Sequence, residues 1–351
     1  GTAVNKDVLF PPEYPYTSGM TKNLHDNFQD LYEESTTVVN YKENSRMIDI
    51  GSNDGTLLSK FKGGGLNVQG IEPTGVFKLA IEKGIPTEND FFTPEVAERV
   101  QKKFGSARFV TATNVFAHID DVHSIVKGII TLLDDKGVFC SENHYLGSLV
   151  ETLQYDTVYH EHLRYYSVTS LQHLLSAHGL EIFHVKKIPT HGGSVRVYSA
   201  RKGQYPVRDS VKELMAQEER TCTSEKALKE FAHRVFLSKL EINAALYDIK
   251  RKGQRIYGIG APSRSSTLIN YVGLDANGID MVCEMKGSLK LDKYMPGTLI
   301  PVREESCLYQ DQPDYALMLS WHIADELIPK IRAKGFKGKF IVPLPHVRIV
   351  E

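Results

Sequence analysis

The stretch Asp49-Ile50-Gly51-Ser52-Asn53-Asp54-Gly55-Thr56-Leu57-Leu58 joins a short apolar run to a helical pattern. Glycines at positions 51 and 55 let the backbone turn sharply and approach a ligand closely. Their spacing differs from the G-x-G-x-x-G fingerprint of dinucleotide-binding turns. Asp49 and Asp54 add two carboxylates, which suit a ligand with a cationic amino-acid part better than a pyrophosphate. The stretch therefore favours a strand–turn–helix that binds S-adenosylmethionine (SAM).

Short apolar runs alternate with helical spacings on both sides of this turn. Strands are expected at residues 47–50, 68–71, 109–113 and 138–140, and later at 182–187 and 195–200. A helix between the third and fourth strands is expected from the spacing of Val122, Ile125, Val126, Ile129, Ile130 and Leu133. This alternation predicts a Rossmann-like α/β fold, in which helices cover a mostly parallel sheet.

Polar residues at the ends of the expected strands complete a candidate cofactor site. Glu72 ends the second strand, where a carboxylate can bind both ribose hydroxyls. Asp90 lies between the strands expected at 68–71 and 109–113 and can bind the adenine amino group. The expected cofactor-binding set is Asp49, Gly51, Ser52, Asn53, Gly55, Glu72, Asp90 and Asn114. The alternative is that the glycines only mark a turn, as they do in many α/β proteins.

The densest group of chemically active side chains lies between Tyr155 and Ser167. Tyr159 and His162 are three residues apart and would share one face of a helical turn. Glu161 can orient a histidine or bind a substrate hydroxyl. Because H-E-H lacks the H-E-x-x-H spacing that brings two imidazoles to one zinc ion, no metal is expected. Mutual packing of buried tyrosine and histidine is the structural alternative.

Two other segments are candidates to face this cluster. His118 follows the strand expected at 109–113, at the carboxyl edge where α/β sheets bind ligands. The run His191-Gly192-Gly193-Ser194 puts two glycines beside a strand and allows close backbone contact. The structural alternatives are a core or helix-start role for His118 and a simple bulge at the glycines.

A second strand–turn–helix start occurs at Ile256-Tyr257-Gly258-Ile259-Gly260-Ala261-Pro262, and more alternation follows it. Residues 208–252 between the two α/β regions are polar and carry one apolar helical stripe, which predicts one or two long helices linking domains. At the second turn, Arg264, Ser265 and Ser266 are expected at a helix start, where they can bind a diphosphate. A structural turn is the alternative.

Composition excludes several classes of function. The 351-residue chain has 42 Lys plus Arg against 43 Asp plus Glu, so no overall field attracts nucleic acid or an acidic membrane. The sequence contains no apolar run of about 18 residues, and residues 1–12 lack the pattern of a signal peptide. Four cysteines lie far apart, which predicts neither a zinc site nor a disulfide framework. We expect a cytoplasmic protein.

Together these motifs resemble those of the SAM-dependent sugar C-methyltransferases of deoxysugar biosynthesis. The resemblance extends from about residue 8 to residue 345. Its motifs are Tyr14-Pro15-Tyr16-Thr17-Ser18-Gly19, Ile50-Gly51-Ser52-Asn53-Asp54-Gly55, Tyr159-His160-Glu161-His162, His191-Gly192-Gly193-Ser194 and Met295-Pro296-Gly297-Thr298.

The resemblance implies a substrate and a set of roles. The substrate would be a nucleoside-diphosphate 4-keto-6-deoxy sugar, linked to dTDP or GDP, methylated at carbon 3 or, in some members, carbon 5. His162 looks like the base that forms an enolate, which Tyr159 and His118 would stabilise, with Glu161 orienting the base. Tyr14 and Tyr16 would close over the sugar, and His191, Gly193, Ser194, Arg264, Ser265 and Ser266 would bind the substrate.

The implied organisation has four parts. These are an N-terminal segment with a substrate lid (1–40), a methyltransferase domain (41–203), a helical linker (204–252) and a smaller Rossmann-like domain (253–351). Two features depart from the family pattern. The usual N-terminal cysteine-rich zinc module is missing from this sequence, and the second glycine turn carries Arg264 where the family usually has lysine.

Two other classes of function remain open. An NAD-dependent oxidoreductase or epimerase of nucleotide sugars would use the Gly258-Ile259-Gly260 turn, although Ser263 replaces the third glycine and Asp49 heads the other turn. A non-catalytic sugar-nucleotide binder is the third possibility. The nucleotide, the sugar, the methylated carbon and the oligomeric state are left open by the sequence.

Overall fold

The structure, a computed structural model, describes residues 9–12 and 17–351, and these form two compact units. Unit 1 takes in the described residues up to Gly147 together with His160–Thr223. Unit 2 takes in Ser148–Tyr159 and Ser224–Glu351. The chain therefore passes from unit 1 to unit 2, returns, and passes over a second time.

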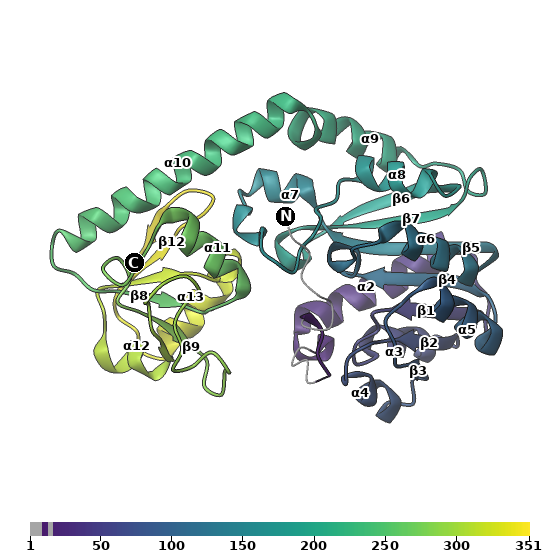
Figure 1. Cartoon of the computed structure of the whole chain (residues 1–351), viewed down its shortest axis with the longest axis horizontal. Coiled ribbons are helices and arrows are strands. Elements are labelled where there is room, and N and C mark those ends of the chain that lie inside the picture. Colours follow the sequence, from purple (N-terminus) through teal and green to yellow (C-terminus); the bar gives the residue numbers. More distant parts are fainter. Residues whose placement is uncertain (1–8, 13–16) are drawn as a thin grey trace. The chain divides into compact units, whose positions relative to one another are not determined.

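Unit 1 is built on a seven-stranded sheet of order β3-β2-β1-β4-β5-β7-β6 (Figure 1). The strands are β1 (Arg46–Ile50), β2 (Asn67–Ile71), β3 (Thr87–Glu88), β4 (Ala107–Thr113), β5 (Leu133–His144), β6 (Leu180–Ile188) and β7 (Ser194–Arg201). Strands β1 to β5 pair in parallel, and β7 is antiparallel to both β5 and β6. The chain starts in the middle of the sheet and reverses direction across it between β1 and β4, which is where such sheets bind ligands.

Helices cover both faces of this sheet. The helical segments are η1 (Ser18–Met20), α2 (Lys22–Val38), α3 (Thr56–Gly63), α4 (Phe77–Glu82), α5 (Pro94–Phe104), η2 (Phe116–His118), α6 (Val122–Leu132), α8 (Val168–Ser176), η4 (Thr190–Gly192), α9 (Asp209–Glu218) and η5 (Glu219–Thr223). Side chains of neighbouring strand residues point to opposite faces. Accordingly, Met47 and Phe109 pack with α2 and α3, while Ile48 and Val110 pack with α5 and α6.

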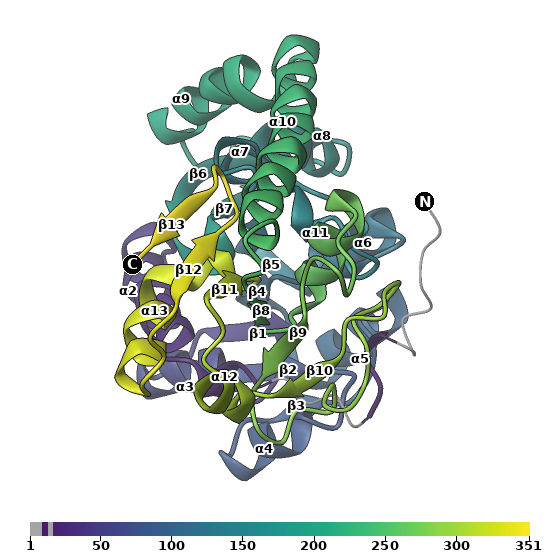
Figure 2. The ribbon, with the colours of Figure 1, turned by 90° about the vertical axis from the view of Figure 1, so that its left-hand side faces the viewer.

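Unit 2 has a six-stranded sheet of order β10-β9-β8-β11-β12-β13, seen across its width in Figure 2. Its elements are η3 (Tyr155–Thr157), α10 (Glu225–Lys250), β8 (Ile256–Ile259), α11 (Ser263–Val272), β9 (Met281–Glu284), β10 (Val302–Glu304), α12 (Ser306–Asp311), β11 (Tyr315–Met318), η6 (Trp321–Ile323), α13 (Ala324–Ala333), β12 (Lys339–Val342) and β13 (Arg348–Val350), while α7 (Leu146–Glu151) spans the first crossing between the units. Only β13 runs antiparallel to its neighbour. Unit 2 is thus a second doubly wound sheet.

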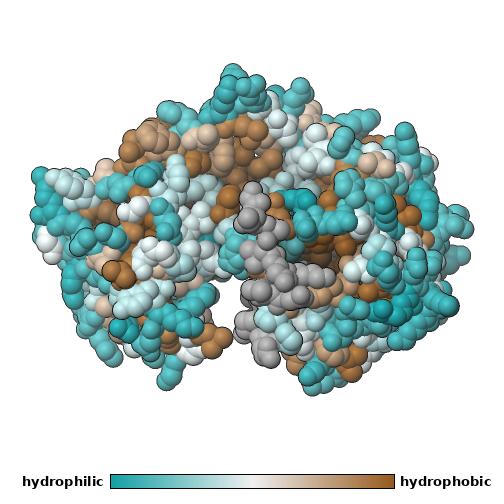
Figure 3. All heavy atoms as spheres, viewed as in Figure 1, coloured by the Kyte–Doolittle hydropathy of each residue, from teal (hydrophilic) through white to brown (hydrophobic). Residues whose placement is uncertain are grey.

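The long helix α10 buries only one stripe of its surface. Ile242, Leu246 and Ile249 join the core of unit 2. Phe236 and Leu240, on another side of the helix, are each 50% exposed, and apolar side chains are visible along this helix in Figure 3. The helix therefore buries its apolar side chains mainly in its C-terminal half, while Phe231 and Val235 pack partly against the same core.

The observed elements confirm the predicted fold class and extend two predicted elements. The strand expected at 138–140 is the middle of a longer strand, β5, and Leu133, expected on the helix before it, begins β5. The apolar pattern missed residues 141–144 because they are polar although buried or half-buried. Residues 208–252 form two helices, α9 and α10.

The compact units divide the chain at other positions than the expected domain boundaries. Unit 1 ends at Thr223, within the expected linker, and the segment Ser148–Tyr159 belongs to unit 2. Leu153 and Tyr155 of that segment are buried in the core of unit 2. Contacts far apart in sequence, and not composition, therefore decide to which unit this segment belongs.

A buried ion cluster attaches α2 to the sheet. Arg196 on β7 is fully buried, and its Nε donates to Oε1 of Glu142 on β5 at 2.7 Å. Its Nη1 donates to Asp30 and Glu34 of α2. Asn27 of α2 donates to the other oxygen of Glu142 at 2.8 Å. Since a buried carboxylate without its partner is strongly unfavourable, this cluster fixes both the position of α2 and its orientation.

The acid sensitivity of the fold follows from this cluster. Burial alone would raise the pKa of Glu34, but hydrogen bonds from His184 and Arg196 outweigh it and lower the pKa to about 2. A carboxyl with a depressed pKa stabilises the fold above its ordinary pKa and loses that contribution as the pH falls toward the depressed value.

We therefore expect Glu34→Gln to lower the free energy of unfolding by about 3 kcal/mol at neutral pH. The difference from wild type should shrink by more than half by about pH 3, measured by urea unfolding. Glu33→Gln, an exposed carboxyl on the same helix, is the matched control and should change little. A Glu34→Gln difference independent of pH would contradict this assignment.

Candidate active site

The turn after β1 depends on residues without a Cβ or with positive φ. Gly51 and Gly55 have φ of +72° and +73°, and Asn53 between them has φ of +50°. A Cβ on Gly51 would lie 2.6 Å from Cγ2 of Val115, in the loop after β4. The backbone of the turn thus packs directly against the neighbouring loop, at the point where the strand order reverses.

Glu72 ties this turn to the end of β2. Its Oε2 accepts the backbone N–H of Asn53 at 2.9 Å, and its Oε1 accepts the N–H and the hydroxyl of Thr74 at 2.9 and 2.6 Å. Only 5% of the residue is exposed. The carboxylate stands at the strand end that ribose recognition requires, and its contact with a ribose stays a prediction.

Asp49 lies in β1, two residues before Gly51 of the turn, and its carboxyl is buried. Its Oδ1 accepts the hydroxyl of Thr111 at 2.6 Å, and 1% of the residue is exposed. Burial raises the pKa of Asp49 to about 7, and the nearby Glu72 and Glu142 add to the rise. A bound cation would favour the ionised form, so this carboxyl is suited to a cationic ligand group.

Asp54, the second carboxylate beside the turn, does not play the expected part. Its oxygens accept the N–H of Gly19 at 3.1 Å and the hydroxyl of Thr56 at 2.7 Å, and they pair with Lys83 at 3.1 Å. Asn53 likewise accepts the N–H of Ser18 at 2.8 Å. Asp54 is therefore bound to its own chain, and its role is to dock residues 18–19 on the turn.

Three further residues of the expected cofactor-binding set, Ser52, Asn114 and Asp90, differ in the hydrogen bonds and ion pairs that their polar groups form. Ser52 is buried, and its Oγ makes no hydrogen bond among the described residues. Asn114 has φ of +57°, and its N–H donates to the carbonyl of Glu142. Asp90 follows β3, but its half-exposed carboxylate pairs with Arg99 at 2.7 Å. The adenine contact of Asp90 stays a prediction, with Arg99 as a competing partner.

Three imidazoles and a phenol gather in unit 1. His162 lies with its ring centroid 5.3 Å from His118, 6.3 Å from His144 and 6.0 Å from Tyr165. His118 and His144 come from the carboxyl ends of neighbouring strands, β4 and β5. His144 and Tyr165 were not predicted. The signal that could have found His144 is its place at the end of a strand beside the candidate loop.

The proton on His118 can be assigned from its partner. Its Nδ1 lies 2.8 Å from the carbonyl oxygen of Glu161. Because a carbonyl only accepts, Nδ1 carries the proton and Nε2 of the neutral ring is an acceptor. Burial lowers the pKa of His118, which favours the neutral form. The Glu161 side chain lies 3.8 Å from Nε2 of His160, and its charge also acts on His118, whose pKa it raises against the larger effect of burial.

Ser194 and its neighbours form a closed turn. His191 has φ of +55° and Gly193 has φ of +116°. Ser194 is fully buried, and its hydroxyl donates to the carbonyl of Thr190 at 3.0 Å. This hydroxyl closes its own loop, and the expected contact of Ser194 with a substrate stays a prediction. The backbone carbonyl of Gly193 accepts the N–H of Tyr145.

Two residues of the expected diphosphate site in unit 2, Arg264 and Ser265, form hydrogen bonds within the chain. Arg264 donates from Nε and Nη2 to the two oxygens of Asp156, at 2.8 and 2.7 Å. Ser265 is fully buried and donates to the carbonyl of Pro262 at 2.6 Å. Nε and Nη2 of Arg264 are thus already bound to the carboxylate of Asp156. Of the three residues expected there, Ser266 alone keeps its predicted role open.

Tyr159 ends the segment that belongs to unit 2, and its N–H donates to the carbonyl of Thr157. Tyr14 and Tyr16 lie outside the described residues. Within residues 9–12 and 17–351, no group of three or more metal-ligating side chains was found, and none of the described helices is long and apolar enough to cross a membrane.

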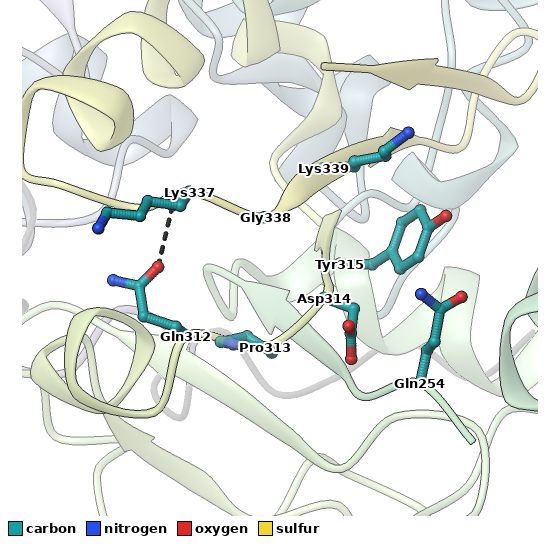
Figure 4. A pocket seen from close by; sticks show the side chains of 8 residues that line it. All are labelled: Gln254, Gln312, Pro313, Asp314, Tyr315, Lys337, Gly338 and Lys339. Carbon is teal, nitrogen blue, oxygen red and sulfur yellow. Dashed lines mark hydrogen bonds between the residues drawn. The ribbon is translucent and has the colours of Figure 1, made fainter. Parts of the chain in front are cut away.

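A shallow hollow in unit 2 lies at the opposite sheet edge from the second glycine turn. It is lined by Gln254, Gln312, Pro313, Asp314, Tyr315, Lys337, Gly338 and Lys339 (Figure 4). Tyr315 and Lys339 are the first residues of β11 and β12. Ligands of doubly wound sheets bind at the carboxyl ends of the strands. This hollow lies at the amino ends of β11 and β12, so it is not where a ligand of this fold is expected.

Comparisons with known proteins agree along the whole chain. Residues 19–185 match a family described as a methyltransferase domain, and residues 189–345 match one described as a C-methyltransferase C-terminal domain. The chain is 32% identical to the C-methyltransferase NovU of Streptomyces niveus over 354 residues, covering 99% of this chain and 83% of NovU.

Solved structures of other methyltransferases are similar to part of the chain. The CcbJ methyltransferase of Streptomyces caelestis has a TM-score of 0.40 and 11% identity, covering 54% of this chain and 93% of its own. The magnesium protoporphyrin IX methyltransferase of Synechocystis, with bound SAH, has a TM-score of 0.38 and 14% identity, covering 51% and 83%.

The geometry of the first turn can be tested by adding one methyl group. Gly51→Ala forces a Cβ against Val115 and a positive φ on alanine, so it should cost about 1 to 3 kcal/mol of stability. Gly63→Ala is the control, because Gly63 ends α3 with open space around its Cα. Thermal unfolding of both variants is the measurement. Equal melting temperatures would show that the turn tolerates a side chain at position 51.

Proposed function

The chain belongs to the C-methyltransferase family, and on that premise we propose that it transfers a methyl group to a carbon atom of a nucleotide-linked keto sugar. It is a SAM-dependent methyltransferase. The observation that carries the proposal is the group of three imidazoles in unit 1, in which His162 contacts His118 and His144. An imidazole is the side chain most often used to remove a proton from a reacting group, so a cluster of them suits this chemistry.

The turn after β1 fits SAM. The glycines at positions 51 and 55 allow the positive φ that shapes the turn, and the carboxyl of Asp49, whose pKa burial raises to about 7, can ionise when a cation approaches. We assign Gly51, Ser52, Asn53, Gly55 and Asn114 to its contacts, with Glu72 toward the ribose and Asp90 toward the adenine. When bound, SAM supplies an electrophilic methyl group.

Proton removal falls to His162 in this proposal. A carbon next to the sugar ketone is acidic, and an imidazole held beside it accepts the proton as a general base. The enolate oxygen formed needs a hydrogen-bond donor. The phenol of Tyr159 is the proposed donor.

His118 takes a different part from the one the resemblance implied. A donor role toward the enolate would require its Nε2 to carry a proton, and Nδ1 already holds the single proton of the neutral ring. Burial disfavours the doubly protonated form. We therefore assign His118 as an acceptor for a sugar hydroxyl or for the ring N–H of a neighbouring histidine.

The substrate class rests on the family resemblance and on residues that remain available. We leave Arg264, Ser265 and Ser194 out of the proposed substrate-binding set, because their polar groups bind the chain itself. Tyr14, Tyr16, His191, Gly193 and Ser266 stay in it as proposals. A dTDP- or GDP-linked 4-keto-6-deoxy sugar methylated at carbon 3 is the proposed substrate.

The decisive experiment is mass spectrometry of a panel of dTDP- and GDP-linked 4-keto-6-deoxy sugars incubated with protein and SAM. At least one sugar should gain the mass of one methyl group, and NMR should locate the methyl on a ring carbon. A parallel incubation with NAD in place of SAM tests the oxidoreductase alternative. Binding of a sugar nucleotide without any change of mass would contradict the proposal and favour a binding protein.

The role of His162 can be tested on the reactive sugar. His162→Ala should lower kcat at least about 100-fold, because a general base contributes that much or more, while the Kd for SAM measured by calorimetry stays within about twofold. His173→Ala, an exposed histidine on α8, is the control and should keep full activity. Near-normal turnover by His162→Ala would assign the base to another residue.

A further inference from the structure

The segment Ser148–Tyr159 leaves unit 1 and is built into unit 2. Leu153 is 1% exposed and Tyr155 is 6% exposed, both within the core of unit 2. The ring of Tyr155 packs edge-on against Tyr271 of α11 with 5.1 Å between centroids. Along the chain, His160 and His162 therefore follow directly on a segment that is packed into unit 2.

A buried ion pair holds the middle of this segment. Asp156 is fully buried and accepts two hydrogen bonds from Arg264, at 2.8 and 2.7 Å. Nε1 of Trp321 donates to the same carboxylate at 2.7 Å, and the guanidinium lies 4.9 Å from the centre of the Trp321 ring. The bidentate geometry and the stacked ring restrict both partners to one arrangement.

This clasp of Asp156, Arg264 and Trp321 occupies a position that doubly wound sheets usually leave to a ligand. Arg264 follows β8 at the start of α11, and Trp321 follows β11. These two strands are neighbours at the point where the strand order of unit 2 reverses, which is the usual ligand crevice. In this chain the carboxylate of Asp156 takes the place there that a bound anion would take.

Both ends of the segment are tied to unit 2 as well. Arg234 of α10 donates to the carbonyls of Val150 and Glu151 at 3.1 and 3.0 Å. The hydroxyl of Thr267 donates to the carbonyl of Val158 at 3.0 Å. The last tie therefore lies one residue before Tyr159 and four residues before His162 along the chain.

From these contacts we propose that Arg264 is a positioning residue, which acts with Asp156 and Trp321 to anchor the chain that carries Tyr159 and His162. The inference rests on the proposed function, in which both residues serve the reaction. Catalysis depends on reacting groups held within about 1 Å of their productive positions. Releasing the segment should therefore slow the chemical step and leave SAM binding, which depends on the turn after β1, unchanged.

The test uses a double variant, Asp156→Asn with Arg264→Met, which removes both charges and so leaves no buried ion without a partner. The matched control, Asp292→Asn with Arg303→Met, removes a surface pair of the same kind from the same unit. Arg264→Lys keeps the charge and should recover part of the effect. Circular dichroism and thermal unfolding establish that each variant is folded.

We expect the clasp variant to lower kcat on the reactive sugar by about 10- to 100-fold, by loss of positioning, with the Kd for SAM within about twofold of wild type. The control pair should behave as wild type. Unchanged kcat would overturn the inference. A raised KM for the sugar nucleotide at unchanged kcat would also overturn it, because it would make Arg264 a substrate ligand.

Hydrogen exchange separates this inference from the proposed function. In the clasp variant, the amides of residues 150–162 should exchange faster than in wild type, while those of β1 and β4 keep their protection. This measurement needs no substrate, so it stands even if no sugar of the panel is methylated by the wild-type protein. Unchanged exchange in 150–162 would show that the clasp does not anchor the segment.

Discussion

The buried pair of Arg196 and Glu142 connects the core of unit 1 to its candidate active site. The carboxylate of Glu142 neutralises the guanidinium that fixes α2, while the backbone carbonyl of the same residue accepts the N–H of Asn114. Asn114 begins the loop that leads to His118, and β5 itself ends at His144. Any shift of this strand would move two of the three clustered imidazoles together. A charged pair inside the core thus serves to place an uncharged site at its edge.

Burial favours the neutral form of two side chains in the candidate active site, Asp49 and His118. It raises the pKa of the carboxyl of Asp49 and lowers the pKa of the imidazole of His118. Both changes favour neutral side chains near pH 7, since burial penalises whichever form is charged. A cationic group near Asp49 would favour the ionised form of this carboxyl. The free protein is in this sense already arranged for a cation on one side and for proton removal on the other.

The sequence was most informative where local rules apply. Alternation and the glycines at positions 51 and 55 predicted the strands, the turn and the class of fold, because strand period and positive φ depend on residues close together. The sequence did not indicate the partners of Asp54, Ser194 and Arg264, whose polar groups form hydrogen bonds within the chain itself. For Asp54 and Arg264 a partner lies 35 and 108 residues away, and such pairings cannot be derived from spacing. Residues 141–144 were missed as strand because their buried polar side chains break the apolar pattern.

The segment Ser148–Tyr159 belongs to unit 2 although it lies in sequence between two parts of unit 1. This limits where the protein can be truncated or recombined with a related enzyme. The chain crosses between its two units three times, after Gly147, after Tyr159 and after Thr223, so no single breakpoint separates them. A hybrid that exchanged only the C-terminal half would pair an Asp156 from one parent with position 264 of the other, where the related family usually has lysine. Chimeras of such enzymes therefore need both pieces of unit 2 from one parent, and the two positions are expected to be inherited as a linked pair.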